Sequence, residues 1–250
     1  MKYYKQLSEY NTFTLNDATK IIGNETNAKK YLDNMIKKDI IHRIKRNLYT
    51  CYNFAMNSDC ADRFEIGSNL SDNSFISYHS AFEFYGYYNQ SYSVIQTSSF
   101  NRIKPFNYNG YNYINYLTNS IVQVDTIKGV RVTSIERTIV DSINMLDKVI
   151  DFEELNNCLD LIHNVNESKI IEVLDAYNKE ILYKKVGLIL SYHNDDFGLS
   201  DDFYDICKRK GIVSNIGTVS NINKNDLVFN SEWGIYTYKN FDKTDSLSRY

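Results

Sequence analysis

The sequence predicts an α+β fold, in which a small N-terminal domain precedes a larger domain that mixes helices and strands. Apolar residues recur at the spacing of amphipathic helices in residues 14–36. Residues 94–99, 111–117 and 130–134 are instead rich in alternating β-branched and aromatic residues, which favours strands. Charge supports the division into domains, because residues 1–55 hold ten Lys/Arg and five Asp/Glu (net +5) and the remainder is net −8. A basic head on an acidic body is typical of a chain in which one part meets a polyanion.

The composition is that of a globular protein. Of the 250 residues, 43% are hydrophobic and 14% aromatic, enough for a sizeable core. No apolar run of about 18 residues predicts a membrane span, and the first residues lack the apolar segment of a signal peptide. The four cysteines lie far apart without a CxxC pair, which indicates reduced thiols rather than disulfides or a zinc site. We therefore expect a cytoplasmic protein.

The first predicted helix begins after Thr14. Apolar residues follow at helical spacing, and Asp17 stands three residues after Thr14, which predicts a capping box with Asp in place of Glu. Gly23 is the residue type that commonly ends a helix. The sequence therefore predicts a short amphipathic helix between Thr14 and Gly23.

A second helix is predicted after a short turn at Asn24 and Glu25, with Thr26 as its N-terminal cap. Its apolar face follows the i, i+3, i+4, i+7, i+8 pattern and comprises Ala28, Tyr31, Leu32, Met35 and Ile36. Its outward positions are Asn27, Lys29, Lys30, Asp33, Asn34 and Lys37. Two short helices joined by a tight turn that contains glycine predict a helix-turn-helix.

Residues 40–49 predict a β-hairpin. Three isoleucines precede its tip and Leu48 and Tyr49 follow it, while the tip itself is Lys45-Arg46-Asn47. A helix-turn-helix followed by such a hairpin predicts a winged helix, which we place at residues 1–57. The larger mixed α/β domain is then residues 58–250, with a loose polar tail from about residue 241.

The winged helix would place its second helix in the major groove of DNA and its wing on the adjacent backbone or minor groove. Lysines on the helix can neutralise phosphates or reach guanine, asparagines can offer an amide to adenine, and Thr26 with the free amides at the helix start can hold a phosphate. Arg46 suits a narrow minor groove. The candidate DNA-binding residues are Thr26, Asn27, Lys29, Lys30, Asn34, Lys37, Arg43, Lys45, Arg46 and Asn47. The alternative is a protein-docking winged helix with solvated lysines.

The larger domain contains further patterns. Residues 152–162, 167–178, 179–192 and 199–211 predict helices, the last capped by Ser200 and closed by Gly211. Residues 226–230 and 233–238 predict a final hairpin.

Residues 132–146 predict another helix, with a structural rather than catalytic set of polar residues. Thr133 and Glu136 have the spacing of a capping box, and Arg137 and Asp141 that of an i, i+4 pair on the surface.

The sequence offers little support for an enzyme. The four histidines form neither HExxH nor HxH, and Gly-rich phosphate loops of the GxGxxG or Walker A type are absent. His79, near the start of a short predicted helix, has the place of a capping or core histidine. We therefore expect no catalytic residues, no cofactor and no metal.

Several stretches resemble the AbiEi-type antitoxins and related transcriptional regulators. TLNDATKIIG followed by TNAKKYLDNMIKKDIIHRIKRNLY resembles their N-terminal winged helix, and SFISYHSAFEFYGYYNQ (74–90) their next strand and helix. GVRVTSIERTIVDSI (129–143) is similar to their hallmark segment with its E-R-T-x-x-D core, and KKVGLILSY (184–192) to a later helix. The resemblance covers most of the chain and is weakest over the last forty or so residues.

The resemblance implies a sequence-specific, double-stranded DNA-binding transcriptional repressor. It would be the autoregulating antitoxin of a type IV toxin–antitoxin system, an abortive-infection defence against phage. Such antitoxins bind inverted repeats in their own promoter, which suits a homodimer, and counter a nucleotidyltransferase-like toxin without a stable complex. Their C-terminal domain supplies the antidote activity. In the best-known members that domain is basic, whereas here it is net acidic, so a stand-alone regulator without a toxin is an alternative beside the protein-interaction module.

Overall fold

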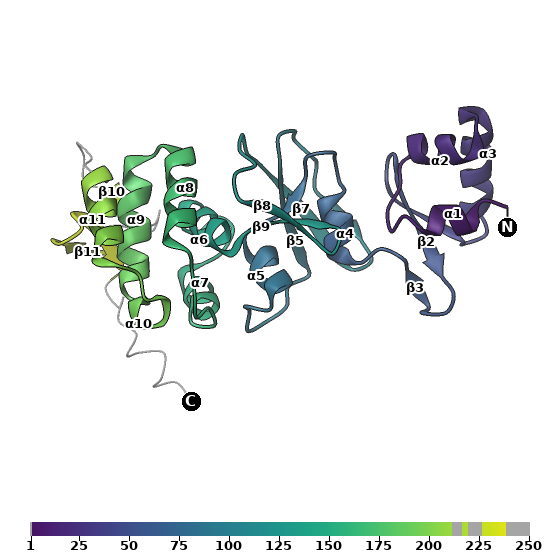
Figure 1. Ribbon diagram of the computed structural model, residues 1–250. Helices are drawn as coiled ribbons and strands as arrows, with labels where there is room; N and C mark the ends of the chain where they lie inside the picture. The colour runs from purple at the N-terminus through teal and green to yellow at the C-terminus, as the bar shows by residue number, and fades with distance from the viewer. Residues whose placement is uncertain (1, 212–216, 220–226, 239–250) are drawn as a thin grey trace. The chain divides into compact units, whose positions relative to one another are not determined.

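The computed structural model describes residues 2–211, 217–219 and 227–238 (Figure 1). The chain divides into two compact units. Unit 1 comprises Met1–Ile76, Ser93–Thr118 and Thr126–Arg131, and unit 2 the remainder. The predicted domain boundary at residue 57 falls inside unit 1, and the tail predicted to be loose lies outside the described residues. The α+β fold class is confirmed by the helices and sheets of both units.

The N-terminal part of unit 1 is a winged helix-turn-helix, as predicted. Its elements are α1 (Tyr4–Ser8), α2 (Leu15–Ile22), α3 (Glu25–Ile36), β1 (Ile41–Lys45), β2 (Leu48–Asn53) and β3 (Ser58–Asp59). The strands form one antiparallel sheet of order β1-β2-β3, in which Ile41 lies opposite Cys51. The core beneath the helices comprises Leu7, Phe13, Ala18, Ala28, Leu32, Met35, Ile41 and Cys51.

Both helices of the motif are capped by side chains. In α2 the predicted capping box is present: the Asp17 amide donates to Thr14 Oγ1, and the Thr14 amide to Asp17 Oδ2 (2.9 Å). Gly23 ends α2 at a φ of +91°, a conformation that glycine adopts without strain. The predicted cap of α3 at Thr26 is wrong. Asn24 caps the helix by accepting from the Asn27 amide (3.1 Å), because its extended backbone follows Gly23 directly and Asn is at least as good a cap as Thr.

A second sheet has six strands in the order β6-β7-β5-β4-β9-β8. They are β4 (Phe75–Ile76), β5 (Val94–Ser99), β6 (Phe106–Tyr108), β7 (Tyr111–Leu117), β8 (Val124–Ile127) and β9 (Val130–Thr133). Strands β5 and β7 are parallel and β6–β7 is a hairpin. The three strands predicted from alternation correspond to β5, β7 and β9. In unit 1, α4 (Arg63–Ser68) packs closely on this sheet, since a Cβ at Gly67 would lie 2.6 Å from Ile76 Cδ1.

Unit 2 is mostly helical. Its helices are α5 (His79–Tyr85), α6 (Ile135–Asn144), α7 (Phe152–Leu159), α8 (Glu167–Tyr177), α9 (Glu180–Ser191), α10 (Asn194–Phe197) and α11 (Asp201–Lys210). The described parts of β10 (Gly217–Thr218), β11 (Leu227–Asn230) and β12 (Ile235–Tyr238) form a small sheet. The predicted helices and the final hairpin are confirmed, as are Ser200 and Gly211 at the ends of α11. None of the helices in the described part of the chain is long and apolar enough to cross a membrane.

The polar residues of α6 lie inside unit 2. The predicted cap at Thr133 is wrong, because Ser134 accepts from the Arg137 amide (3.2 Å). The predicted surface position of Arg137 and Asp141 is also wrong: they form an ion pair (3.2 Å) whose residues are 2% and 1% exposed.

Neighbouring groups satisfy this buried pair. Arg137 donates to the carbonyl oxygens of Ser120 (3.0 Å) and Val122 (2.5 Å), and the Tyr177 hydroxyl donates to Asp141 (2.6 Å). The pair thus connects α6 to the segment of Ser120 and Val122 and to Tyr177 of α8, which suits a structural role.

Candidate nucleic-acid interface

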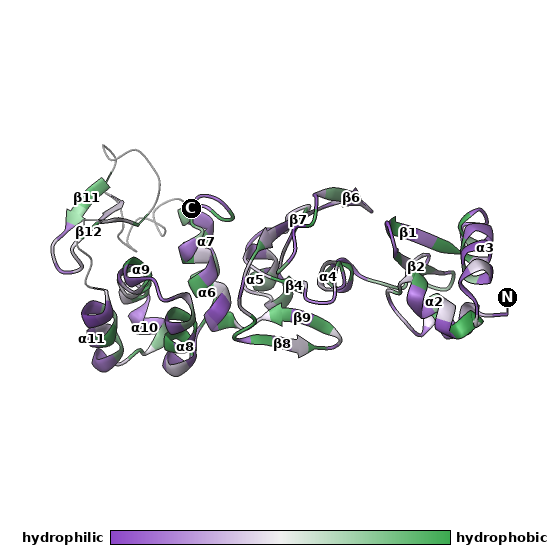
Figure 2. Ribbon diagram, turned by 90° about the horizontal axis from the view of Figure 1, so that it is seen from above, coloured by the Kyte–Doolittle hydropathy of each residue, from purple (hydrophilic) through white to green (hydrophobic). Residues whose placement is uncertain are grey.

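The outward face of α3 is polar and exposed. In Figure 2 hydrophilic residues predominate along this helix. Its buried face comprises Ala28, Leu32 and Met35. Residues at i, i+4, i+7 and i+11 share a helix face, so the line opposite the core comprises Thr26, Lys30, Asp33 and Lys37, all exposed. A helix placed in the major groove would present this line to the base edges.

The other predicted contact residues of α3 lie on its flanks. At 100° per residue, Asn27 and Asn34 fall on one side of the central line and Lys29 on the other; all three are exposed. Lys29 Nζ forms an ion pair with Glu25 Oε1 (2.5 Å), and the lysine ammonium is the main reason that the pKa of Glu25 is lowered. None of the described acidic residues forms an ion pair with Lys30 or Lys37, so these two are the better placed cations.

Asp33 stands in the middle of the central line, between Lys30 and Lys37. A carboxylate repels the phosphate backbone, but it can accept a hydrogen bond from the amino group of cytosine. Asp33 is therefore more compatible with sequence-selective binding to DNA than with nonspecific binding to polyanions.

The wing presents fewer cations than its sequence predicts. Arg43 and Arg46 are exposed. Lys45 Nζ instead donates to the carbonyl oxygen of Leu70 (2.7 Å), and burial lowers the pKa of its ammonium. Asn47, at a φ of +63°, accepts from the amide of Leu15 (3.0 Å) and so ties the wing to the start of α2. Lys45 and Asn47 are used within the protein, and direct contact with DNA is not expected from them.

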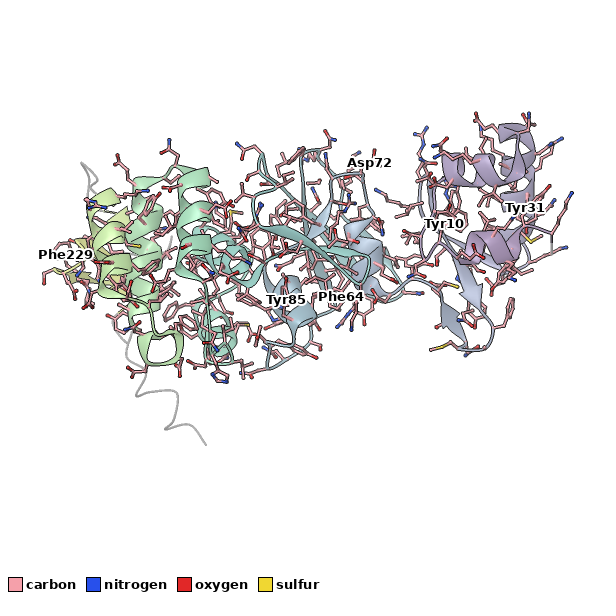
Figure 3. All side chains as sticks on the ribbon, in the orientation of Figure 1. Tyr10, Tyr31, Phe64, Asp72, Tyr85 and Phe229 are labelled. Atoms are coloured by element: carbon pink, nitrogen blue, oxygen red, sulfur yellow. The ribbon has the colours of Figure 1, made fainter. Side chains whose placement is uncertain are left out.

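A cleft of about 410 Å³ lies beside the wing in unit 1. Lys45, Arg46 and Arg131 line it together with Asp17 and Asp72; Asp72 is labelled in Figure 3. Most of its cationic groups are already bound by the protein, since the Arg131 guanidinium donates to the carbonyl oxygens of Ser68 (2.5 Å) and Ser71 (2.9 Å). No sequence pattern indicates Arg131, because only the tertiary fold brings β9 to this loop. The hydrogen bonds of Lys45 and Arg131 thus hold the base of the wing in place, and these cations are not available to a ligand in the cleft.

A buried acid anchors the first strand of the wing. Asp59, whose side chain is 3% exposed, binds His42 Nδ1 (2.6 Å) and accepts from the Tyr108 hydroxyl and the Asn109 side-chain amide (2.7 Å each). These contacts join β1 to the β6–β7 hairpin within unit 1. Contacts with the rest of unit 1 therefore hold the first strand of the wing in place.

An exposed apolar patch, missed by the sequence patterns, lies at the turn between β2 and β3. Phe54 is 58% exposed and Met56 72% exposed. The Phe54 ring packs edge-on against Tyr52 and lies near Tyr4. Tyr10, labelled in Figure 3, is a further exposed ring of this domain. Exposed aromatic and Met side chains of this kind are typical of surfaces that contact other proteins.

Two clusters of described residues bring possible metal ligands within 4.8 Å of one another. One comprises His79, Glu154 and Cys158, and the other Asp160, His193 and Asp196. The sequence patterns indicate neither, because each cluster brings together residues that are distant in sequence: His79 meets Glu154 and Cys158 of α7, and Asp160 meets His193 and Asp196.

Comparison with known proteins identifies the fold alone. No family model matches the sequence, and no curated protein matches it. The fold is similar to the crystal structure of the RV2827C protein from Mycobacterium tuberculosis, with a TM-score of 0.63 and 11% sequence identity. The match covers 94% of this chain and 89% of that one. The two proteins therefore share an architecture over nearly their whole lengths.

Proposed function

We propose that this protein is a sequence-specific, double-stranded DNA-binding transcriptional repressor that acts in the cytoplasm. The observation that carries the proposal is the outward line of α3. It presents Lys30 and Lys37 without acidic partners among the described residues, on the second helix of a helix-turn-helix, ahead of a wing with an exposed Arg46. Two cations on the helix and one on the wing suit the charge of a DNA duplex.

The biological setting follows from the resemblance to AbiEi-type antitoxins. On this proposal the protein binds inverted repeats in its own promoter as a homodimer, because two-fold proteins and inverted repeats match. It represses a type IV toxin–antitoxin operon and counters a nucleotidyltransferase-like toxin without binding it stably. The acidic larger domain sets it apart from the best-known members, so the DNA-binding part of the proposal stands independently of the toxin.

The proposal is tested with DNA from directly upstream of the gene. The full chain should bind this DNA much more tightly than a scrambled sequence of the same composition, and nuclease protection should reveal two symmetric half-sites. Equal affinity for both sequences would contradict sequence-specific repression. A toxin co-expression assay then separates an antitoxin, which rescues growth, from a stand-alone regulator, which does not.

A second candidate function is a protein-interaction module. It is favoured by the exposed patch of Phe54 and Met56. On this alternative the winged helix docks on a protein partner. A Phe54→Ser/Met56→Ser variant then loses its function while the affinity of the full chain for DNA stays at the background level.

A further inference from the structure

The cluster of Asp160, His193 and Asp196 in unit 2 has contacts that a hydrogen-bond network does not explain. His193 is 3% exposed, and its Nε2 lies 3.3 Å from Asn156 Oδ1. With the proton on Nε2 donated to this oxygen, the neutral imidazole has its lone pair on Nδ1. Nδ1 is buried and has no hydrogen-bond partner in the described structure, although Asp160 Oδ1 lies only 3.2 Å away.

The position of the Asp160 oxygen is that of a neighbouring ligand. It is close enough for an ion pair but does not meet the geometry of a hydrogen bond with Nδ1. Two ligand atoms that bind one tetrahedral ion at about 2.0–2.1 Å lie about 3.3 Å apart, and their lone pairs point at the ion rather than at each other. The 3.2 Å separation agrees with this arrangement. Asn156 then orients the imidazole ring by accepting a hydrogen bond from Nε2, the ring nitrogen that does not bind the metal.

The surrounding helices also favour a cation. Asp160 is the C-terminal cap of α7, and His193 directly follows the C-terminal cap of α9, Tyr192. Helix C-termini carry partial negative charge, so an aspartate there is unfavourable unless a cation offsets it. Asp196, in the short α10, brings a second carboxylate within 4.8 Å of the other two ligand atoms. The C-terminal ends of α7 and α9 and two carboxylates therefore lie beside an imidazole nitrogen that has no hydrogen-bond partner in the described structure.

The buried cluster of His79, Glu154 and Cys158 lacks this feature. His79 Nε2 and Glu154 Oε1 are hydrogen-bonded at 3.0 Å, and the Cys158 thiol donates to the same oxygen (3.8 Å). These groups satisfy one another without an ion.

We propose that Asp160, His193 and Asp196 bind a divalent transition-metal ion of the Zn²⁺ type. One imidazole nitrogen and two carboxylate oxygens suit Zn²⁺, whereas Mg²⁺ prefers oxygen ligands alone. The ion would join the end of α7 to the junction of α9 and α10, and so stabilise unit 2. This inference is independent of the proposed DNA binding.

The test measures Zn²⁺ binding by calorimetry, and thermal unfolding with and without Zn²⁺, on the metal-stripped full chain. The wild type should bind one Zn²⁺, which raises its Tm, and excess Mg²⁺ should not compete. Asp160→Asn should weaken Zn²⁺ binding at least tenfold. Without metal the same variant should be as stable as the wild type or more stable, because it removes an acid from a helix C-terminus. The Tm of the wild type should therefore exceed that of the variant only when Zn²⁺ is present.

Two further variants locate the site. Asp195→Asn removes a neighbouring exposed carboxylate outside the cluster and should leave Zn²⁺ binding unchanged, and Cys158→Ser should do the same. Undiminished binding in Asp160→Asn, or loss of binding in Cys158→Ser, would overturn the assignment. Absence of Zn²⁺ binding by the wild type would overturn it too. A metal-free Asp160→Asn protein less stable than the wild type would also overturn it, because it would indicate a simple ion pair between Asp160 and His193.

Discussion

Lys29 and Lys30 are adjacent residues of the same type, yet the structure gives them different environments. Lys29 pairs with Glu25 on the flank of α3, whereas Lys30 lies on the central outward line. An exposed ion pair contributes little to stability, but the Glu25 carboxylate offsets the charge that Lys29 presents to an anion. The i, i+4 spacing of Glu25 and Lys29 makes such a pair foreseeable from the sequence, whereas the inward turn of Lys45 is not, since it depends on the carbonyl group of Leu70, twenty-five residues away.

This difference gives a prediction for DNA affinity. Lys30→Ala should weaken binding to the operator by about 1–3 kcal/mol if Lys30 contacts a base. Lys29→Ala should have a smaller effect, because Lys29 lies on the flank of α3 and its charge is already offset by Glu25. Anisotropy titrations of both variants measure the two losses side by side. A larger loss in Lys29→Ala than in Lys30→Ala would show that α3 presents a different face to DNA.

Among the secondary-structure elements, long periodic segments were predictable, whereas the shortest ones, such as α1 and β3, were not. The apolar stripes of α2, α3 and α7–α9 each span two turns or more, so the helical period is visible in the sequence. Helix α1, with five residues, and β3, with two, are too short to show a period, and tertiary contacts hold them. The buried Arg137–Asp141 pair was missed because an i, i+4 ion pair has the same spacing on a surface as in a core.

The start of α3 gives a prediction for stability. Asn24→Ala removes the side-chain oxygen that accepts from the Asn27 amide and should lower the free energy of unfolding by about 0.5–2 kcal/mol. Thr26→Ala, two residues later in the first turn, should change it by less than about 0.5 kcal/mol. Urea unfolding of the two variants measures both changes. A larger loss in Thr26→Ala than in Asn24→Ala would place the cap at Thr26 instead.

At the scale of the whole molecule, burial links the stability of unit 2 to pH. Burial lowers the pKa of His79, although the Glu154 and Glu83 carboxylates act in the opposite direction. Neutral His79 is therefore favoured in the folded state, and the unfolded chain binds more protons below the ordinary histidine pKa of about 6.5. The corresponding stability is fully present above that pH and is lost as the pH falls through the lower pKa of the folded protein.

We therefore expect the Tm of the full chain to fall between pH 7 and pH 5. His79→Gln should flatten this dependence, by at most about 1.4 kcal/mol of unfolding free energy per pH unit. His163→Gln, which replaces an exposed histidine, is the matched control and should keep the wild-type slope. A His79→Gln profile parallel to that of the wild type would assign the acid sensitivity to other groups.

On the proposed function, the winged helix binds DNA through the outward line of α3 and the tip of the wing. The most direct measurement is the anisotropy of labelled promoter DNA at two salt concentrations, with the wild type and a Lys30→Ala/Lys37→Ala/Arg46→Ala variant. We expect tight wild-type binding with a log–log salt slope of about −3.6 per copy for roughly four phosphate contacts. The variant, which removes three of the proposed cations, should show a shallower slope by about 2–3. Identical slopes and affinities in the two proteins would show that these three residues do not form the DNA-binding surface.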